Sequence, residues 1–270
     1  MLRYVKIGNG PKTMIAFHGF GRDAHMFSSY ENVFPAYTIY SIALYYHGSE
    51  WKYQNQMMDD QLWTSIFTDF LIAHDITRFS LLGYSLGGKV ALYTYQLFSE
   101  QVDSLELIAP YGIKNSIVEH FTQKLPFLYR RLEKYVHQPA FFLTLLEVMQ
   151  KYKVVNKTIL EITKNQMNTW EKRCRAYHTM LLYGAIRLNL KEISLKMKAS
   201  DSPVTFYLGR YDQVLTLKAL KKLIGSLRNF SLHVLPAGHG SLPGKVEKIL
   251  REQSGWVFQH ERTYEVVREY

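Results

Sequence analysis

The sequence predicts an α/β fold in which a mostly parallel central sheet is flanked by helices and interrupted by an inserted helical cap. Short β-branched or apolar runs alternate with helical patterns in residues 1–112, as they do where helices connect the strands of a parallel sheet. Residues 113–198 then carry Lys, Arg, Tyr, Phe and Leu at helical spacing with almost no glycine. Sheet-like runs resume within residues 199–270. We therefore expect a core made of 1–112 and 199–270, and a cap made of 113–198.

The expected strands share a β-branched or apolar composition and lie at 13–18, 37–44, 80–83, 104–109, 203–208 and 230–235. Before the first of them the chain leaves room for one further strand. The expected helices have apolar residues at helical spacing and cover 57–75, 86–98, 217–223 and 245–260. In the cap, Pro126 and Pro139 are expected to separate one helix from the next.

Length and composition favour a compact enzyme or binding domain with a real core. The chain has 270 residues, 47% hydrophobic content and a net charge of +10. Neither a signal peptide nor a stretch of roughly 18–20 apolar residues is recognisable, so we expect a cytoplasmic protein without stable membrane insertion. Cys174 is the single cysteine, which excludes an intrachain disulfide. The basic residues are dispersed among acids and no recognition motif accompanies them, so a solvated surface is expected rather than nucleic-acid binding.

The strongest chemical signal is a G-x-S-x-G sequence at residues 83–87. It joins an apolar strand directly to a helix, which is the context of a nucleophile elbow, where a sharp turn lifts the serine above the sheet. Such a turn leaves no room for side chains beside the nucleophile, which explains Gly83 and Gly87 around Ser85. A phosphate-binding turn is the alternative, but it lacks a Lys-Ser/Thr pair and leaves the serine unexplained.

The Gly-rich turn HGFG at residues 18–21 follows an earlier strand. In this position the backbone N–H of Phe20 and that of Leu86 are expected to form an oxyanion hole. His18 is expected to brace the loop and not to act as the base.

An acid and a base are expected after the serine, each just beyond a later strand. Asp212 lies directly after the strand ending near residue 208, and His239 follows the strand ending near residue 235. Asp201 is the competitor, but it precedes its strand and would lie at the wrong end of the sheet. Imidazole takes the proton of Ser85 and returns it to the leaving group, while the carboxylate fixes the imidazole tautomer.

In the order HGFG, GYSLGG, GRYD and AGHG, the chain resembles the α/β-hydrolase superfamily over nearly its whole length. The resemblance implies a serine hydrolase with a helical cap at 113–198. Many relatives carry D-x-x-G-x-G-x-S after the second expected strand, where this chain has other residues at 43–49. A serine instead of an aspartate nucleophile argues against an epoxide hydrolase or a haloalkane dehalogenase.

The favoured function is hydrolysis of a small or medium carboxylic ester, with a small-molecule substrate and with neither metal nor cofactor. Aromatic and leucine residues of the cap are expected to be mostly cap core, with a minority lining an acyl pocket. The candidate substrate-binding residues are Tyr84, Lys89, Phe142 and Tyr183.

Two other functions remain open. The motifs also resemble the menaquinone-pathway synthase that eliminates pyruvate from a succinylated cyclohexene dicarboxylate, in which arginines hold the carboxylates. Here Lys89 stands where that family has Arg. Arg173, Arg175 or Arg187 could supply a further cation, although a solvated surface charge is the favoured interpretation for each. In a simple esterase Lys89 would instead extend to solvent. A ligand-binding or signalling protein on the same fold is the third reading.

Overall fold

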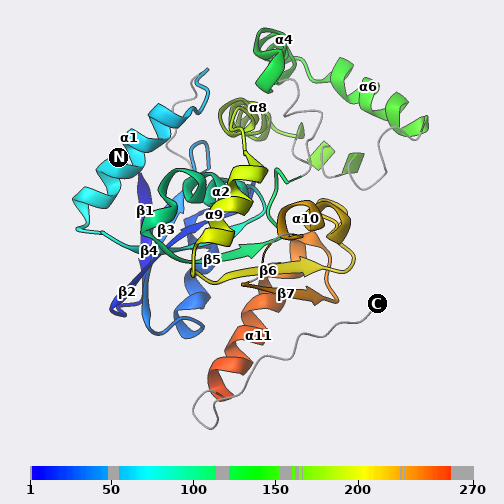
Figure 1. Cartoon of the computed structure of the whole chain (residues 1–270). Coiled ribbons are helices and arrows are strands. Elements are labelled where there is room, and N and C mark those ends of the chain that lie inside the picture. Colours follow the sequence, from blue (N-terminus) through cyan, green and yellow to red (C-terminus); the bar gives the residue numbers. More distant parts are fainter. Residues whose placement is uncertain are drawn as a thin grey trace. The chain divides into compact units, whose positions relative to one another are not determined.

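The computed structural model describes residues 2–47, 55–113, 122–152, 160–161, 164–165, 167–225, 227 and 229–256 (Figure 1). The chain divides into two compact units. The first, here called the core unit, comprises Met1–His47, Asp60–Lys114 and Leu188–Tyr270. The second, here called the helical unit, comprises Gly48–Asp59 and Asn115–Arg187.

The core unit contains a seven-stranded sheet in the order β1-β3-β2-β4-β5-β6-β7. Only β1 is antiparallel to its neighbour, and the other paired strands run parallel. The strands are β1 (Arg3–Ile7), β2 (Lys12–Phe17), β3 (Tyr37–Ala43), β4 (Phe79–Tyr84), β5 (Val102–Ile108), β6 (Val204–Gly209) and β7 (Phe230–Leu235). The expected fold class is therefore confirmed, with β1 as the additional N-terminal strand.

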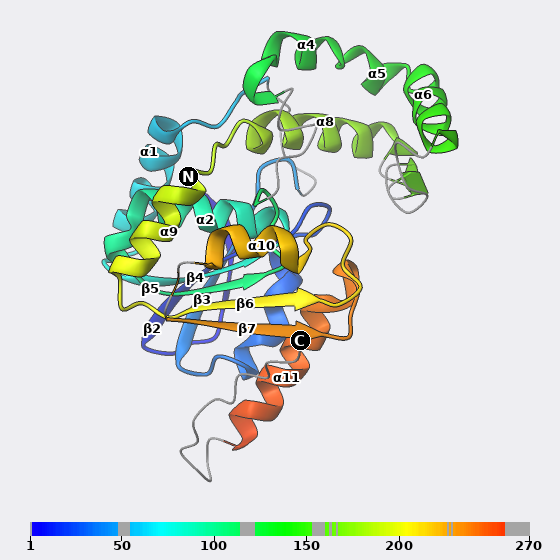
Figure 2. The ribbon, with the colours of Figure 1, turned by 45° about the vertical axis from the view of Figure 1, so that its right-hand side comes forward.

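Helices cover both faces of this sheet (Figure 2). On one face α2 packs on β4, β2 and β5, and α9 packs on α2 and α10. On the other face α11 packs on β5, β6 and the 3-10 helix η1. These helices are η1 (Ala24–Asn32), α1 (Asp60–Ala73), α2 (Leu86–Phe98), α9 (Leu190–Ala199), α10 (Leu217–Ile224) and α11 (Leu242–Trp256), with short 3-10 turns η2 (Ser99–Gln101) and η3 (His239–Ser241).

The described residues of the helical unit form helices and their connections. These are α4 (Pro126–Arg131), α5 (Lys134–His137), α6 (Ala140–Lys151) and α8 (Trp170–Gly184). Pro126 begins α4 and Pro139 precedes α6, as their missing N–H groups allow. A small apolar cluster around Tyr129, Tyr177 and Leu181 holds α4 and α8 together.

The unit boundaries differ from the expected ranges at two places. Residues from Leu188 on belong to the core unit, because α9 is tied to α2: the Asn189 N–H bonds Gln96 Oε1 at 2.9 Å and Lys196 Nζ bonds the Gln96 carbonyl at 2.5 Å. Residues 48–59, which were expected in the core, belong to the helical unit, where the Met58 N–H bonds the Leu182 carbonyl at 3.1 Å. The expected helix 57–75 accordingly begins only at Asp60. Of the expected helix 245–260, residues 257–260 lie outside the described part of the chain.

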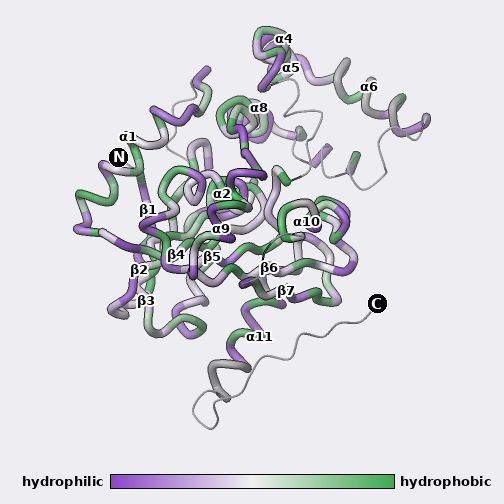
Figure 3. Tube along the Cα trace, viewed as in Figure 1, coloured by the Kyte–Doolittle hydropathy of each residue, from purple (hydrophilic) through white to green (hydrophobic). Residues whose placement is uncertain are grey.

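Apolar side chains of the strands and of α2 contribute many of the buried hydrophobic residues, and hydrophobic positions recur along the traces of these elements (Figure 3). Strand β4 is buried at every position, as expected for a central parallel strand covered on both faces. Among the described residues, no helix combines the length and the apolar character needed to cross a membrane. Because β2, β4, β6 and β7 run parallel, their carboxyl ends carry their loops at one edge of the sheet.

Candidate active site

Ser85 lies in the sharp turn between β4 and α2, in a strained backbone conformation. Its φ of 53° is in the left-handed region, which costs a non-glycine residue about 1–3 kcal/mol. Backbone hydrogen bonds enforce this geometry: the Ser85 N–H bonds the Ile108 carbonyl at 2.9 Å, and the Ser85 carbonyl accepts from the Tyr111 N–H at 2.8 Å. The end of β5 and the residues just after it therefore hold Ser85 in place through main-chain hydrogen bonds.

The glycines of this turn are required by close packing. A Cβ atom on Gly87 would lie 1.9 Å from the Phe17 carbonyl oxygen, and one on Gly83 would lie 2.6 Å from the Gly87 carbonyl oxygen. A Cβ on Gly88 would lie 2.6 Å from the Pro110 Cα. Since real Cβ atoms do not approach backbone this closely, the motif reflects a steric requirement of the turn.

His239 connects Ser85 to Asp212. Its Nε2 lies 2.8 Å from Ser85 Oγ, and its Nδ1 lies 2.7 Å from Asp212 Oδ2. An ionised carboxylate only accepts hydrogen bonds, so this pairing favours a proton on Nδ1 and leaves Nε2 to accept from the serine hydroxyl. The three side chains thus form one hydrogen-bonded chain from hydroxyl to carboxylate, with the arrangement of a catalytic triad.

Asp212 is held from several sides. Its side chain is fully buried, and its Oδ1 accepts the Val214 N–H at 2.7 Å and the Leu215 N–H at 3.2 Å. Both carboxylate oxygens are therefore used, one by the loop and one by His239. Asp201 is exposed and precedes β6, at the opposite end of that strand.

The HGFG loop lies directly beside the nucleophile turn. A Cβ on Gly19 would lie 2.7 Å from the Tyr84 ring and 3.4 Å from Ser85 Cβ. Phe20 follows on this loop, and Leu86 is the first residue of α2, where backbone N–H groups have no partner within the helix. The two expected oxyanion donors thus belong to segments that flank Ser85.

His18 is buried and connects the HGFG loop to the end of β3. Its Nδ1 donates to the Gly19 carbonyl at 2.9 Å, and its Nε2 accepts the Leu44 N–H at 3.1 Å. Burial lowers the pKa of His18 to about 4, so the ring is neutral at pH 7 and keeps this single tautomer. These contacts agree with a bracing role and leave no ring nitrogen for base chemistry.

Tyr84, expected to bind substrate, instead contacts the candidate base. Its hydroxyl donates to the His239 carbonyl at 3.0 Å, and the two rings lie 5.3 Å apart. Burial raises the pKa of Tyr84 to about 12, so the hydroxyl remains a donor. The side chain before the nucleophile therefore supports the loop of the base, which the motif alone did not reveal.

Lys89 is buried, with 1% of its surface exposed, and does not extend to solvent. A Cβ on Gly112 would lie 3.0 Å from its Cγ and Cδ, so its methylenes pack on the chain after β5. Its Nζ lies 5.8 Å from the centre of the Tyr111 ring. The solvent-facing lysine expected for a simple esterase is therefore not found: the side chain is buried, with its methylenes against Gly112 and its Nζ near Tyr111.

The other candidate residues lie in the helical unit. Tyr183 is fully buried on α8, and Phe142 lies on α6 with its side chain outside the described part. Arg173 donates to the carbonyls of Val136 (2.6 Å) and Met167 (3.0 Å). Arg187 donates to the Gln123 carbonyl at 2.7 Å. Both arginines thus make structural contacts within that unit.

Comparison with known proteins identifies the class to which the fold and the site belong. The model of the alpha/beta hydrolase fold matches residues 12–245, so the chain belongs to this family. A 79-residue stretch is 33% identical to 2-succinyl-6-hydroxy-2,4-cyclohexadiene-1-carboxylate synthase of Escherichia coli (strain SMS-3-5 / SECEC). That match covers 29% of this chain and only 31% of the relative.

Two solved structures share the fold at low identity. The enol-lactonase from Burkholderia xenovorans LB400 superposes with a TM-score of 0.61 at 13% identity, covering 96% of both chains. A hydrolase from Pseudomonas aeruginosa PA01 gives a TM-score of 0.63 at 17% identity, covering 94% of both chains. At these identities the likeness establishes the fold alone.

Proposed function

We propose that this protein is a serine hydrolase that cleaves a small or medium carboxylic ester through an acyl-enzyme intermediate. The observation that carries the proposal is the continuous chain from Ser85 Oγ to His239 Nε2 (2.8 Å) and from His239 Nδ1 to Asp212 (2.7 Å). A strained nucleophile turn beside a Gly-rich loop supports it, because that pairing is where acyl-transfer enzymes of this fold stabilise an oxyanion.

In the proposed reaction His239 Nε2 takes the proton of Ser85 as Oγ attacks the ester carbonyl carbon. The Phe20 and Leu86 N–H groups donate to the resulting oxyanion. Collapse expels the alcohol, which receives the proton from His239, and leaves the acyl group on Ser85. Water then attacks the acyl-enzyme with His239 again as base, releasing the carboxylic acid and restoring the serine. We further propose that the part of the expected cap that belongs to the helical unit, Asn115–Arg187, shapes the acyl pocket.

Covalent labelling tests the nucleophile. The wild-type chain should react with a fluorophosphonate at Ser85, identified by peptide mass, and should hydrolyse esters of graded acyl length. Ser85→Ala should lose labelling and lower turnover by roughly 10⁴–10⁶ while retaining the wild-type thermal unfolding midpoint. Labelling at another serine, or undiminished turnover in the variant, contradicts the assignment.

A second function, elimination of pyruvate from a succinylated cyclohexene dicarboxylate, is favoured by two observations. The 79-residue match is to 2-succinyl-6-hydroxy-2,4-cyclohexadiene-1-carboxylate synthase, and Lys89 is a buried basic residue one helical turn after Ser85. In this reaction the Ser85–His239 pair would abstract a proton and a cation would hold a substrate carboxylate. We rank it second, because lysine presents a point charge where arginine would grip a carboxylate bidentately.

Lys89→Met separates the two functions. Methionine keeps an apolar stem against Gly112 while removing the charge, so the core should remain packed. For an esterase, kcat/KM on neutral esters should change by less than about tenfold, which is under ~1.4 kcal/mol. Robust wild-type turnover of the dicarboxylate, with a loss in Lys89→Met confined to that substrate, would establish the synthase function instead.

A further inference from the structure

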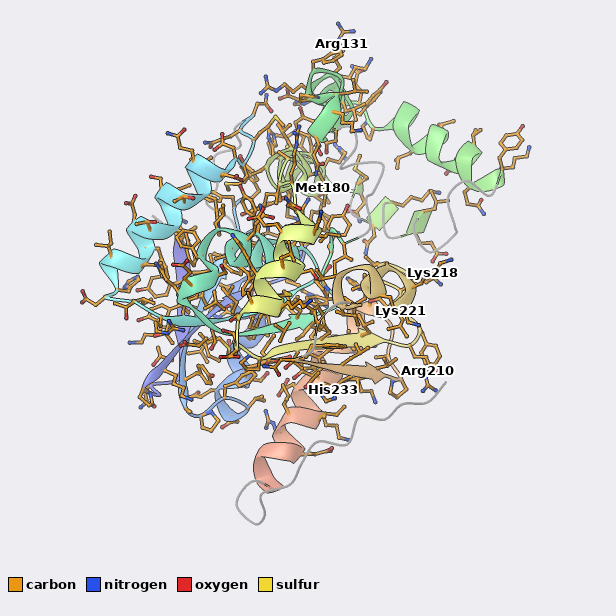
Figure 4. All side chains as sticks on the ribbon, viewed as in Figure 1. Arg131, Met180, Arg210, Lys218, Lys221 and His233 are labelled. Carbon is orange, nitrogen blue, oxygen red and sulfur yellow. The ribbon has the colours of Figure 1, made fainter. Side chains whose placement is uncertain are left out.

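The segment that follows β6 exposes apolar and basic side chains together. Tyr211, Val214 and Leu217 are 65%, 42% and 39% exposed, a high fraction for large hydrophobic residues. Three exposed cations flank them, and Figure 4 shows Arg210, Lys218 and Lys221 along one side of the core unit. We call this set the 210–221 surface; its members are Arg210, Tyr211, Val214, Leu217, Lys218 and Lys221.

The segment is anchored to the core unit by other side chains. Other residues of the same segment anchor it: Leu215, Leu220 and Leu223 are buried, and Asp212 bonds the loop backbone from inside. Helix α10 is thus amphipathic, with hydrophilic and hydrophobic residues both visible along its trace (Figure 3). A single exposed hydrophobic residue needs no explanation, but three within seven positions, flanked by cations, indicate a contact surface.

The basic residues of the segment outnumber its acids. Residues 210–225 contain four basic residues and one acid, and that acid is the buried Asp212, which faces His239. The neighbouring helix α9 continues this character, since it exposes Lys191, Leu195 and Lys198. Its acid, Glu192, is paired with Lys196 at 3.0 Å. The surface is therefore complementary to an extended layer of negative charge.

We propose that the 210–221 surface docks on an anionic lipid bilayer. Lysine and arginine near such a surface each contribute attraction of about 1 kcal/mol, and apolar side chains gain by entering the boundary between headgroups and acyl chains. A bilayer accepts both kinds of side chain without matched shape, whereas a polyanion such as an acidic peptide would use the cations alone. Asp212 would keep its contacts in the docked state, because its carboxylate points into the core unit.

Vesicle co-sedimentation of the full chain tests the proposal. Vesicles of phosphatidylcholine with about 30 mol % phosphatidylglycerol should bind the protein, pure phosphatidylcholine should not, and salt should weaken binding by screening. Lys218→Glu/Lys221→Glu should lower the partition coefficient at least about tenfold. Tyr211→Ser/Leu217→Gln should also lower it, by about threefold or more, with the salt dependence retained.

The matched control is Lys245→Glu/Lys248→Glu, which reverses two exposed lysines at the same spacing on α11 of the same unit. It should change partition by less than about threefold, and all variants should keep the wild-type unfolding midpoint. The proposal is contradicted if the protein does not bind the anionic vesicles or if it binds neutral vesicles equally well. It is also contradicted if both lysine-pair variants lose binding equally. Sedimentation without vesicles would assign the surface to a second copy of the chain. Binding that survives Tyr211→Ser/Leu217→Gln and transfers to polyglutamate would assign it to an acidic protein.

Discussion

Ser85 and His239 are both flanked by glycines in the sequence, but the two pairs of glycines have different physical reasons. Around Ser85, a Cβ on Gly87 would lie 1.9 Å from the Phe17 carbonyl oxygen. Around His239, a Cβ on Gly238 or Gly240 would meet nothing within 4 Å. The nucleophile turn is therefore compressed between main-chain segments, whereas the loop of the base has open space on both sides.

The difference shows how each group is positioned. Ser85 is fixed through its backbone, which is strained at a φ of 53° and bonded to the last residue of β5 and to Tyr111 just after it. His239 is fixed by the contacts that Asp212 and Tyr84 make with it. A substitution that removes a side-chain contact should therefore disturb the position of His239. One that adds side-chain bulk should instead disturb the turn around Ser85.

The largest effect within this comparison is expected for Asp212→Asn. The amide would donate where the carboxylate accepts, favouring the tautomer that presents an N–H to Ser85, so kcat should fall by roughly 10⁴. Ester turnover under saturating substrate measures this, and the crystal structure of the variant should retain all three side chains in place.

Asp201→Asn is the control for this change, because it alters the same chemical group at the opposite end of β6. It should leave kcat within a factor of about two, as surface substitutions usually do. If the two phenotypes were exchanged, His239 would not depend on Asp212.

The glycines provide the next contrast, in stability. Gly87→Ala forces a methyl group into backbone, so the free energy of unfolding should fall by about 3 kcal/mol or more. Gly240→Ala adds the same methyl group in open space and should change it by no more than about 0.5 kcal/mol. Urea denaturation of both variants measures the difference. Equal losses would show that the packing around Ser85 does not distinguish the two turns.

The sheet and the proximity of Ser85, His239 and Asp212 could be predicted from the sequence because both follow from local patterns. Buried parallel strands read as apolar runs, and a residue just after such a strand must lie at the carboxyl edge of the sheet. The positions of Ser85, Asp212 and His239 were predictable on this basis, and the structure brings them within hydrogen-bonding distance.

What the sequence did not reveal depends on contacts between distant segments. The sequence of helix α9 resembles that of the helices before it, and its packing on α2 and α10, together with its bonds to Gln96, places it in the core unit. The burial of Lys89 depends on Gly112, 23 positions further along the chain. The role of Tyr84 depends on a carbonyl 155 positions away. No local periodicity encodes such pairs.

The smallest effect is expected for Tyr84→Phe, which tests directly whether a side-chain contact positions His239. Phenylalanine keeps the ring against His239 but deletes the hydroxyl that donates to the His239 carbonyl, a bond of 3.0 Å. Loss of one neutral hydrogen bond costs about 0.5–1.5 kcal/mol, which corresponds to a decrease in kcat of roughly two- to tenfold.

The kinetic pattern of this variant separates a positioning role from substrate binding. If Tyr84 positions His239, kcat and the rate of fluorophosphonate labelling should fall together while KM stays near its wild-type value. If Tyr84 contacts the substrate, KM should rise with kcat unchanged. Tyr93→Phe is the matched control, since Tyr93 is a buried tyrosine of the core unit whose hydroxyl donates to Asp60 Oδ1 at 2.5 Å. It should lower stability at least as much without slowing labelling, because the Tyr93 hydroxyl bonds a carboxylate of α1, whereas the Tyr84 hydroxyl bonds the loop that carries His239.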